Sequence, residues 1–277
     1  MLPPIASRFV AGETAAEALD RARRLNGRDV GAILNLLGEH HTDRRRVERD
    51  AGAYRRLLGD LAGTDLRARV SVKPSQLGLE IGAAFFEEQL RRVIEATPGG
   101  FVWIDMEGHE TVDATLSAYE TLAREHPGRL GVCVQANLKR TRADLDRLAD
   151  VPGKVRLVKG AYDPPRSVAY RKTTRVNEAY ESLLEFVFRE FDGGIAVGSH
   201  DPRMIEYAEA LSAEHGTGFE IQMLMGVRED AQFDLADEHD VWQYVPYGSG
   251  WLAYFYRRVK ERRENATFAL RALVSGS

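Results

Sequence analysis

Cysteine is almost absent from the sequence. Cys133 is the one cysteine among 277 residues, so a framework of disulfide bonds is excluded and a reducing compartment is expected. It lies in the apolar run GVCVQ, where no neighbouring charge would lower the pKa of its thiol. The sequence therefore favours a buried structural thiol over a catalytic one.

Long apolar segments and an excess of basic charge are also missing. No stretch approaches the roughly 18 uninterrupted apolar residues that a membrane-spanning helix needs, and the first residues lack the pattern of a signal peptide. The 38 Lys and Arg residues are outnumbered by 42 Asp and Glu residues, so no overall basic field favours nucleic acid. We expect a cytoplasmic protein that binds no nucleic acid, with peripheral contact on the inner face of the cell membrane left open.

No low-complexity tract or long Pro/Gly-rich linker divides the chain. The 44% hydrophobic and 29% charged composition is typical of a globular protein with enough apolar mass for a large core. We expect a single domain over residues 1–277, with residues 1–30 as an N-terminal helical segment.

What recurs along the chain is a short apolar run followed by an amphipathic, charged stretch. The runs are rich in β-branched and aromatic residues, as buried parallel strands are. Regular strand–helix units imply a parallel sheet, and eight of them in about 250 residues favour a closed (βα)8 barrel. An open doubly wound sheet is the alternative, but no GxGxxG follows the first run. The eight runs are residues 31–39, 69–78, 101–108, 130–137, 155–162, 195–200, 218–226 and 241–248.

Two further segments have helical character. The amphipathic stretch AAEALDRARRLN (15–26) precedes the first strand, and we expect it to cap the bottom of the barrel. The stretch WLAYFYRRVKERREN (251–265) is the candidate for the eighth helix. On a helix Tyr254, Arg257 and Arg258 stand at i, i+3 and i+4 and share one face, which separates them from Lys260 and Arg263.

Polar side chains stand at the end of every predicted strand. Charges in apolar runs are unfavourable unless they are paired or functional, and in a barrel of this type the chemistry lies at the C-terminal ends of the strands. The set as a whole favours a ligand site there. Its members, in strand order, are Glu39, Lys73, Gln76, Asp105, Glu107, Gln135, Asn137, Arg156, Lys159, Tyr162, His200, Asp201, Glu220, Gln222, Tyr244 and Tyr247.

Some of these residues admit more than one interpretation. Lys73 could form a structural salt bridge with Asp105 on the neighbouring strand, or also touch a ligand. Asp105 and Glu107 fall on the same strand face and could be paired catalytic carboxylates, although Lys73 would neutralise one of them. The cluster Glu39-His40-His41 lacks the spacing of a metal site, and no metal is expected. Among the histidines, His200 at a strand end is the favoured functional one.

The cations at the fifth strand fit two chemistries. Arg156 and Lys159 are three residues apart, so they point to opposite faces unless a bulge intervenes, and together they suit an anionic ligand. Alternatively, Lys159 or Lys73 could form a Schiff base in a barrel lyase or aldolase. A non-catalytic protein that docks through the basic stretch 251–265 is a third hypothesis, which the acidic net charge disfavours.

The strand-end motifs taken in order resemble the proline dehydrogenase family in its short, monofunctional form. The resemblance covers nearly the whole chain and rests on many motifs together. The motifs are SRFVAGET (7–14), NLLGE (35–39), SVKPSQLGL (71–79), WIDMEG (103–108), VQANLKRT (134–141), VRLVKGAY (155–162), SH (199–200), FEIQMLMG (219–226) and YVPYG…YFYRRVKERREN (244–265).

The resemblance implies a distorted (βα)8 barrel of the TIM type that holds FAD, with the eighth helix over the barrel mouth. It implies oxidation of L-proline to Δ1-pyrroline-5-carboxylate, with the electrons passed to a membrane quinone. Since 277 residues have no room for the second enzyme of bifunctional relatives, a separate pyrroline-5-carboxylate dehydrogenase would consume the product.

The family's site residues carry over onto matching positions. Arg257 and Arg258 resemble the pair that holds the proline carboxylate, and Lys73 and Asp105 an ion pair below the substrate. The residues that resemble the walls of the substrate pocket are Tyr162, Leu224, Tyr244 and Tyr254. The residues that resemble FAD contacts are Gln135, Arg156, Lys159, Gly160, His200 and Gln222, with Lys172 and Glu261 in less similar segments.

Two motifs depart from the family's pattern. The stretch Ser199-His200-Asp201 stands where Thr-His-Asn is common, and Asn137 begins NLKR where an aromatic version with Tyr is frequent. Both departures fall on residues that are implied to lie near the flavin. They would alter its contacts without changing the chemistry.

Overall fold

Eight parallel strands close into a barrel in which β8 pairs with β1. The computed structural model describes residues 3, 6–252 and 254. All eight apolar runs are confirmed as strands. The closed barrel is confirmed, and the alternative of an open doubly wound sheet is excluded. The strands are β1 (Gly31–Leu36), β2 (Ala68–Val72), β3 (Val102–Ile104), β4 (Leu130–Gln135), β5 (Lys154–Val158), β6 (Ile195–Gly198), β7 (Phe219–Leu224) and β8 (Asp240–Tyr247).

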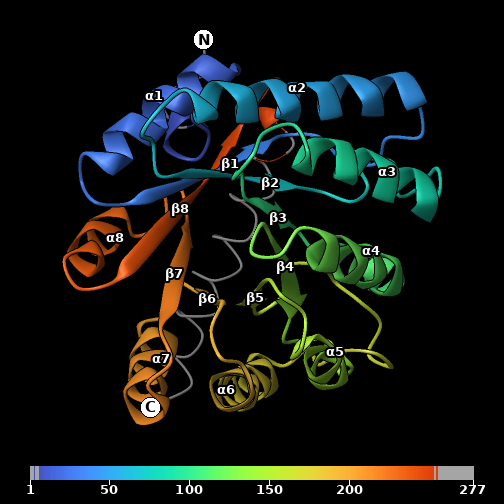
Figure 1. The fold of residues 1–277 in the computed structure, drawn as a ribbon. Coiled ribbons are helices and arrows are strands. Elements are labelled where there is room, and N and C mark those ends of the chain that lie inside the picture. Colours follow the sequence, from blue (N-terminus) through green and yellow to red (C-terminus); the bar gives the residue numbers. More distant parts are fainter. Residues whose placement is uncertain (1–2, 4–5, 253, 255–277) are drawn as a thin grey trace.

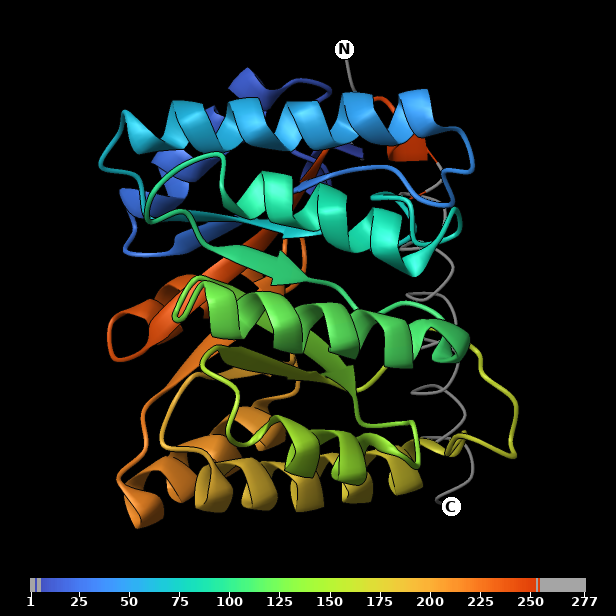
Figure 2. The same cartoon turned by 45° about the vertical axis from the view of Figure 1, so that its right-hand side comes forward.

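A ring of helices covers the outer surface of the barrel (Figure 1), and the turned view shows them lying alongside the strands that they connect (Figure 2). Their apolar faces pack on the outward side chains of the strands, which makes the main core. Among the described residues no helix is long and apolar enough to cross a membrane. The helices are α1 (Ala15–Asn26), α2 (Arg44–Ala62), α3 (Ala83–Ile94), α4 (Val112–Glu125), α5 (Thr141–Leu148), α6 (Thr173–Glu190), α7 (Pro202–His215) and α8 (Glu229–Ala236), with short 3-10 turns η1 (Ala6–Arg8) and η2 (His109–Thr111).

The helix α1 lies beside the barrel and not below it. Thr14 and Glu17 form a capping box at its start, and its buried face, which includes Ala22 and Leu25, packs toward β1 and β8. Arg21 donates to the outward-facing Gln243 of β8 at 2.7 and 3.0 Å. Figure 1 shows α1 between α8 and α2, which is the place of a helix that would follow β8 in a regular barrel. The prediction that this segment caps the bottom is therefore wrong.

The strands end earlier than the apolar runs suggest. β3, for example, contains only Val102–Ile104 of the predicted 101–108. Asp105 donates one last backbone hydrogen bond to Val72, and the residues beyond it turn away from the sheet. The polar side chains after Ile104 therefore stand on loops at the rim, which is where a barrel of this kind carries its site.

The interior of the barrel is filled by side chains. Trp103 and Trp242 lie in a cluster with Ile33 and Ala196. Their rings occupy the space in front of Gly31 and Gly131, where any side chain would collide with the indoles. Glycine at these two positions is what lets two tryptophans share the barrel centre.

The segment after β8 is only partly described. Trp251, Leu252 and Tyr254 are helical, and Tyr254 is buried against Phe9 and Val10. The predicted helix 251–265 otherwise lies outside the described residues, as do Arg257, Arg258 and Glu261.

Candidate active site

Asp105 is the centre of a hydrogen-bonded network at the C-terminal mouth of the barrel. Its Oδ1 accepts from Ser71 Oγ at 2.7 Å and from the guanidinium of Arg156, and its Oδ2 accepts from the Tyr244 hydroxyl at 2.6 Å. These partners come from β2, β5 and β8. Since β3 is next to neither β5 nor β8, the contacts must cross the interior of the barrel.

Arg156 is buried and fixed on several sides. Besides Asp105 it donates to Gln222 Oε1 at 3.0 Å, and its guanidinium lies 4.9 Å from the centre of the Trp103 ring. Burial alone would lower the pKa of Arg156, but Cys133 and Asp105 hold it above its usual value, so the cation is retained. A charged guanidinium held by several contacts stands at the base of the mouth.

Tyr244 keeps its proton at neutral and moderately alkaline pH. Burial and the neighbouring Asp105 carboxylate raise its pKa well above the usual value. Its hydroxyl is therefore a permanent donor to Asp105, and its ring can form a wall of a pocket.

Lys73 does not form the predicted ion pair with Asp105. Its ammonium donates to Asn35 Oδ1 at 3.0 Å, and Asn35 in turn donates through Nδ2 to the Ser71 carbonyl at 2.9 Å. Among the described residues, the cation that pairs with Asp105 is Arg156. The prediction was wrong because it considered only the neighbouring strand, whereas Arg156 reaches Asp105 across the interior.

Asn35 and Ser71 contact the site but are not among the site residues predicted from the sequence. Both are fully buried and face the interior beside Lys73 and Asp105. A buried amide in the otherwise apolar first strand and a serine two residues before Lys73 were the available signals.

The residues at the ends of β4 to β7 are bonded to the ends of neighbouring strands. Gln135 donates to the carbonyls of Met106 and Glu107 at 3.0 and 2.8 Å. Lys159 pairs with Asp201 at 2.9 Å, and His200 Nε2 accepts from the backbone N–H of Leu224 at 2.7 Å. His200 therefore bridges the ends of β6 and β7.

The remaining predicted positions are more open. Tyr162 is 37% exposed, and Lys172 is an exposed residue at the start of α6. The structure thus brings Lys73, Asp105, Gln135, Arg156, Gln222 and Tyr244 into the mouth, with His200, Leu224 and Lys159 at its rim.

The cluster Glu39-His40-His41 lies near the protein surface, where both histidines contact carboxylates. His40 pairs with Glu80, and His41 Nε2 lies 2.9 Å from Asp50 Oδ2. Nothing among residues 3, 6–252 and 254 groups three or more metal-ligating side chains.

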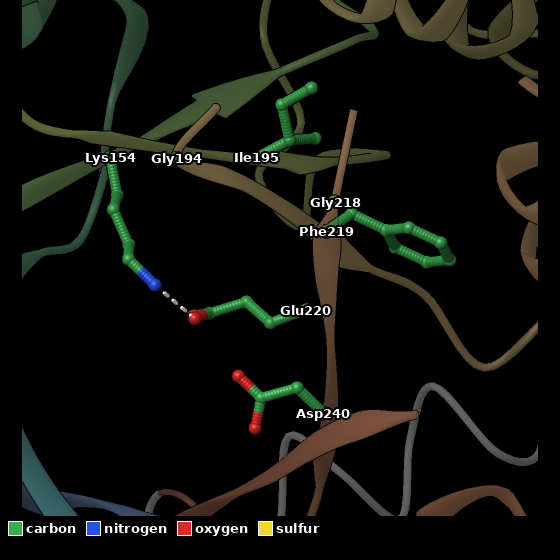
Figure 3. Close-up of a pocket in the computed structure, with 7 residues that line it drawn as sticks. All are labelled: Lys154, Gly194, Ile195, Gly218, Phe219, Glu220 and Asp240. Atoms are coloured by element: carbon green, nitrogen blue, oxygen red, sulfur yellow. Dashed lines mark hydrogen bonds and ion pairs between the residues drawn. The ribbon is translucent and has the colours of Figure 1, made fainter. Parts of the chain in front are cut away.

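The opposite end of the barrel, the floor, holds a second charged network. Glu220 accepts from Arg69 at 2.8 Å and from Lys154 at 2.5 Å, and Arg69 lies 3.7 Å from the centre of the Trp242 ring. Figure 3 shows Lys154 reaching Glu220. Both residues line a pocket of about 240 Å³. Because Glu220 stands near the start of β7, its prediction as a strand-end residue of the mouth is wrong.

Comparison with known proteins agrees with the motifs over most of the chain. Residues 18–271 match the family model described as "Proline dehydrogenase". A proline dehydrogenase of Deinococcus radiodurans is 35% identical over 284 residues, which cover 98% of this chain and 91% of that protein. "Proline dehydrogenase 1" of Bacillus subtilis subsp. natto is 32% identical, with 97% and 90% covered.

Solved structures with the same fold are longer proteins. Proline utilization A from Bdellovibrio bacteriovorus, inactivated by N-propargylglycine, superimposes with a TM-score of 0.84 at 23% identity, and proline utilization A from Corynebacterium freiburgense with 0.79 at 21%. The matches cover 92% and 96% of this chain but 32% of each of those chains. The chain thus spans about a third of these structural neighbours.

Proposed function

We propose that the chain, which belongs to the proline dehydrogenase family, oxidises L-proline to Δ1-pyrroline-5-carboxylate. Its cofactor would be FAD, and its electron acceptor would be a quinone. The observation that carries the proposal is the network of Asp105, Arg156 and Tyr244 at the barrel mouth, in a chain that aligns with proline dehydrogenases over almost its full length. We further propose that residues 1–277 work as one domain.

The residues at the mouth fit a flavin dinucleotide. Gln135, Arg156, Lys159, Gly160, His200 and Gln222 would hold it, and Lys172 and Glu261 would add contacts from the adjoining segments. Gly160 at the end of β5 has a φ of 105°, and the Asn137 amide occupies the space that a side chain there would fill. A buried amide oxygen beside it, Asn137 Oδ1, has no hydrogen-bond partner among the described residues. A buried acceptor without a described partner supports a ligand that carries hydrogen-bond donors.

The substrate would be held by the chain's own side chains. Arg257 and Arg258 would grip the proline carboxylate by forked, charge-assisted hydrogen bonds that lysine does not reproduce. Tyr162, Leu224, Tyr244 and Tyr254 would surround the apolar ring and exclude water. When bound, FAD supplies the acceptor for the hydride that leaves the carbon next to the nitrogen.

The protonation states of the site support this role. The proline nitrogen must be neutral to release hydride from the neighbouring carbon, so activity rises with pH. Tyr244 stays protonated because its pKa is raised, and it keeps Asp105 in place throughout that rise. Arg156 likewise retains its charge.

The partners follow from the reaction. Electrons passed to a membrane quinone require at least transient contact with the membrane surface, so we propose a cytoplasmic enzyme with peripheral attachment. The product is a reactive imine, which a separate pyrroline-5-carboxylate dehydrogenase would oxidise further.

A visible absorption spectrum tests the cofactor and the substrate together. The purified protein is expected to show a flavin band that bleaches when L-proline is added without oxygen. A colourless protein that borohydride traps with its substrate would instead identify a Schiff-base lyase. Both lysine amines are engaged by protein groups, Lys73 by Asn35 and Lys159 by Asp201, which does not favour that alternative.

A further inference from the structure

Asn137 has a buried side chain whose oxygen is left without a partner. The residue is 6% exposed, and its Oδ1 is buried and accepts no hydrogen bond from a described residue. An unsatisfied buried acceptor destabilises a protein by roughly 1–3 kcal/mol, so such atoms need an explanation. A group that donates a hydrogen bond to Oδ1 would remove this penalty.

The backbone around Asn137 is firmly held, so the free oxygen is not a product of a loose loop. Its N–H donates to the Lys159 carbonyl at 3.0 Å, and its carbonyl accepts from Tyr170 at 2.8 Å. Leu138 next to it forms a β-bridge with Ala169. The side chain is therefore presented by a segment bonded on both sides.

The amide lies among the residues proposed to hold the cofactor. Asn137 is two residues beyond Gln135, at the end of β4, and its backbone pairs with that of Lys159. A Cβ placed on Gly160 would overlap the Asn137 amide, so the glycine provides the space in which that amide lies. Asn137 is also the first residue of NLKR, where the sequence departs from its family.

We propose that Asn137 is a cofactor-binding residue of this chain, whose Oδ1 accepts a hydrogen bond from an N–H or O–H group of FAD. A flavin dinucleotide offers ring N–H groups, an adenine amino group and several hydroxyl groups, whereas its phosphate oxygens at neutral pH accept hydrogen bonds and cannot satisfy another acceptor. This inference rests on the proposed FAD dependence.

The test is the variant Asn137→Leu, which keeps the size of the side chain and removes the acceptor. The dissociation constant of FAD is measured on apoprotein by quenching of flavin fluorescence, and thermal unfolding of the apoprotein is measured in parallel. We expect FAD binding to weaken roughly tenfold. We expect the apoprotein to unfold at the same or a higher temperature, because the unsatisfied acceptor is gone.

The matched control is Asn26→Leu at the floor end of α1. The Asn26 amide is satisfied, since it donates to the Val30 carbonyl at 3.0 Å and accepts from the Arg67 N–H at 2.8 Å. This variant should lower the unfolding temperature of the apoprotein and leave the FAD dissociation constant unchanged.

Three results would overturn the proposal. The first is an unchanged FAD dissociation constant in Asn137→Leu, and the second is equal weakening in Asn26→Leu, which would make the effect one of general stability. The third is wild-type protein that binds no FAD, and this result alone also removes the proposed cofactor.

Discussion

The mouth and the floor of the barrel both contain buried charge, but they satisfy it differently. At the floor, one carboxylate, Glu220, is shared by two cations, and the ring of Trp242 covers one of them. At the mouth, Asp105 has one cation, the ammonium of Lys73 is held by a neutral amide, and the Asn137 oxygen has no partner. Gln222 joins the two networks, since it donates to Glu220 at 2.6 Å and accepts from Arg156 at 3.0 Å. At the floor protein groups satisfy Glu220, whereas the mouth leaves polar groups that a ligand can satisfy.

Removing the cation at the mouth should have the largest effect. In Arg156→Met, Asp105 loses its ion-pair partner while it remains surrounded by protein, and Gln222 loses a donor. Leaving one member of a buried pair costs about 3–5 kcal/mol, so the free energy of unfolding should fall by that amount. Urea denaturation of the apoprotein measures it. A loss below about 1 kcal/mol would mean that Asp105 finds other partners.

Removing the carboxylate at the floor should affect stability but not activity. Glu220→Gln leaves Arg69 and Lys154 with a neutral acceptor, and Lys154 is exposed enough to reach water. We expect the free energy of unfolding to fall by about 2–4 kcal/mol. The kcat/KM for proline at 25 °C should stay within about twofold of wild type, because the amide oxygen of the new side chain can still accept from Gln222, which links the floor to Arg156. A tenfold loss of kcat/KM would show that the charge at the floor affects the reaction at the mouth, and would contradict the comparison.

The proposed carboxylate clamp consists of Arg257 and Arg258, which lie outside the described residues. Arg257→Met or Arg258→Met should raise KM for proline strongly and lower kcat/KM by an amount equivalent to about 2–4 kcal/mol. Steady-state kinetics with an artificial dye as acceptor measures both constants. An unchanged KM in both variants would remove the clamp assignment.

The smallest expected effect is a difference in acid stability. Burial by itself would raise the pKa of Glu220, but Arg69 and Lys154 lower it below its usual value of 4.5. On acidification the unfolded chain takes up this proton before the folded one, so the stabilisation is complete above that value and is lost as pH falls through the lowered native pKa. Urea denaturation between pH 6 and pH 3 should therefore show a shallower loss in Glu220→Gln than in wild type. Parallel curves would contradict the assignment.

Patterns along the chain predicted the barrel but not the contacts across it. Eight runs of β-branched residues sufficed for the strands, because each reflects local burial. Asp105 meets Arg156 from 51 residues away, and no local pattern says which inward side chains meet across the interior. The predicted partner Lys73 was nearer in the sheet, but its ammonium is held by Asn35. The strand alternation that was applied to Asp105 and Glu107 would also have indicated Ser71, two residues before Lys73.

The position of α1 was beyond local prediction for a related reason. Its amphipathic pattern, with Ala18, Ala22 and Leu25 on one face, shows that one side is buried but not against which strands. The link between Arg21 and Gln243 joins residues 222 positions apart. Glu220 was misplaced in the same way, since a short apolar run does not reveal which of its polar residues starts the strand.

The seam where α1 covers β8 and β1 has a consequence for how the chain folds. The barrel closes only when β8, which ends at Tyr247, pairs with β1, which begins at Gly31. This is the longest loop closure in the barrel, and contacts of such sequence separation slow folding. During synthesis β1 and β7 each keep an unpaired edge until β8 has left the ribosome. The nascent protein is most prone to edge-to-edge aggregation while these edges are unpaired. Once β8 has paired with β1, α1 packs over both strands and would stabilise the closed barrel.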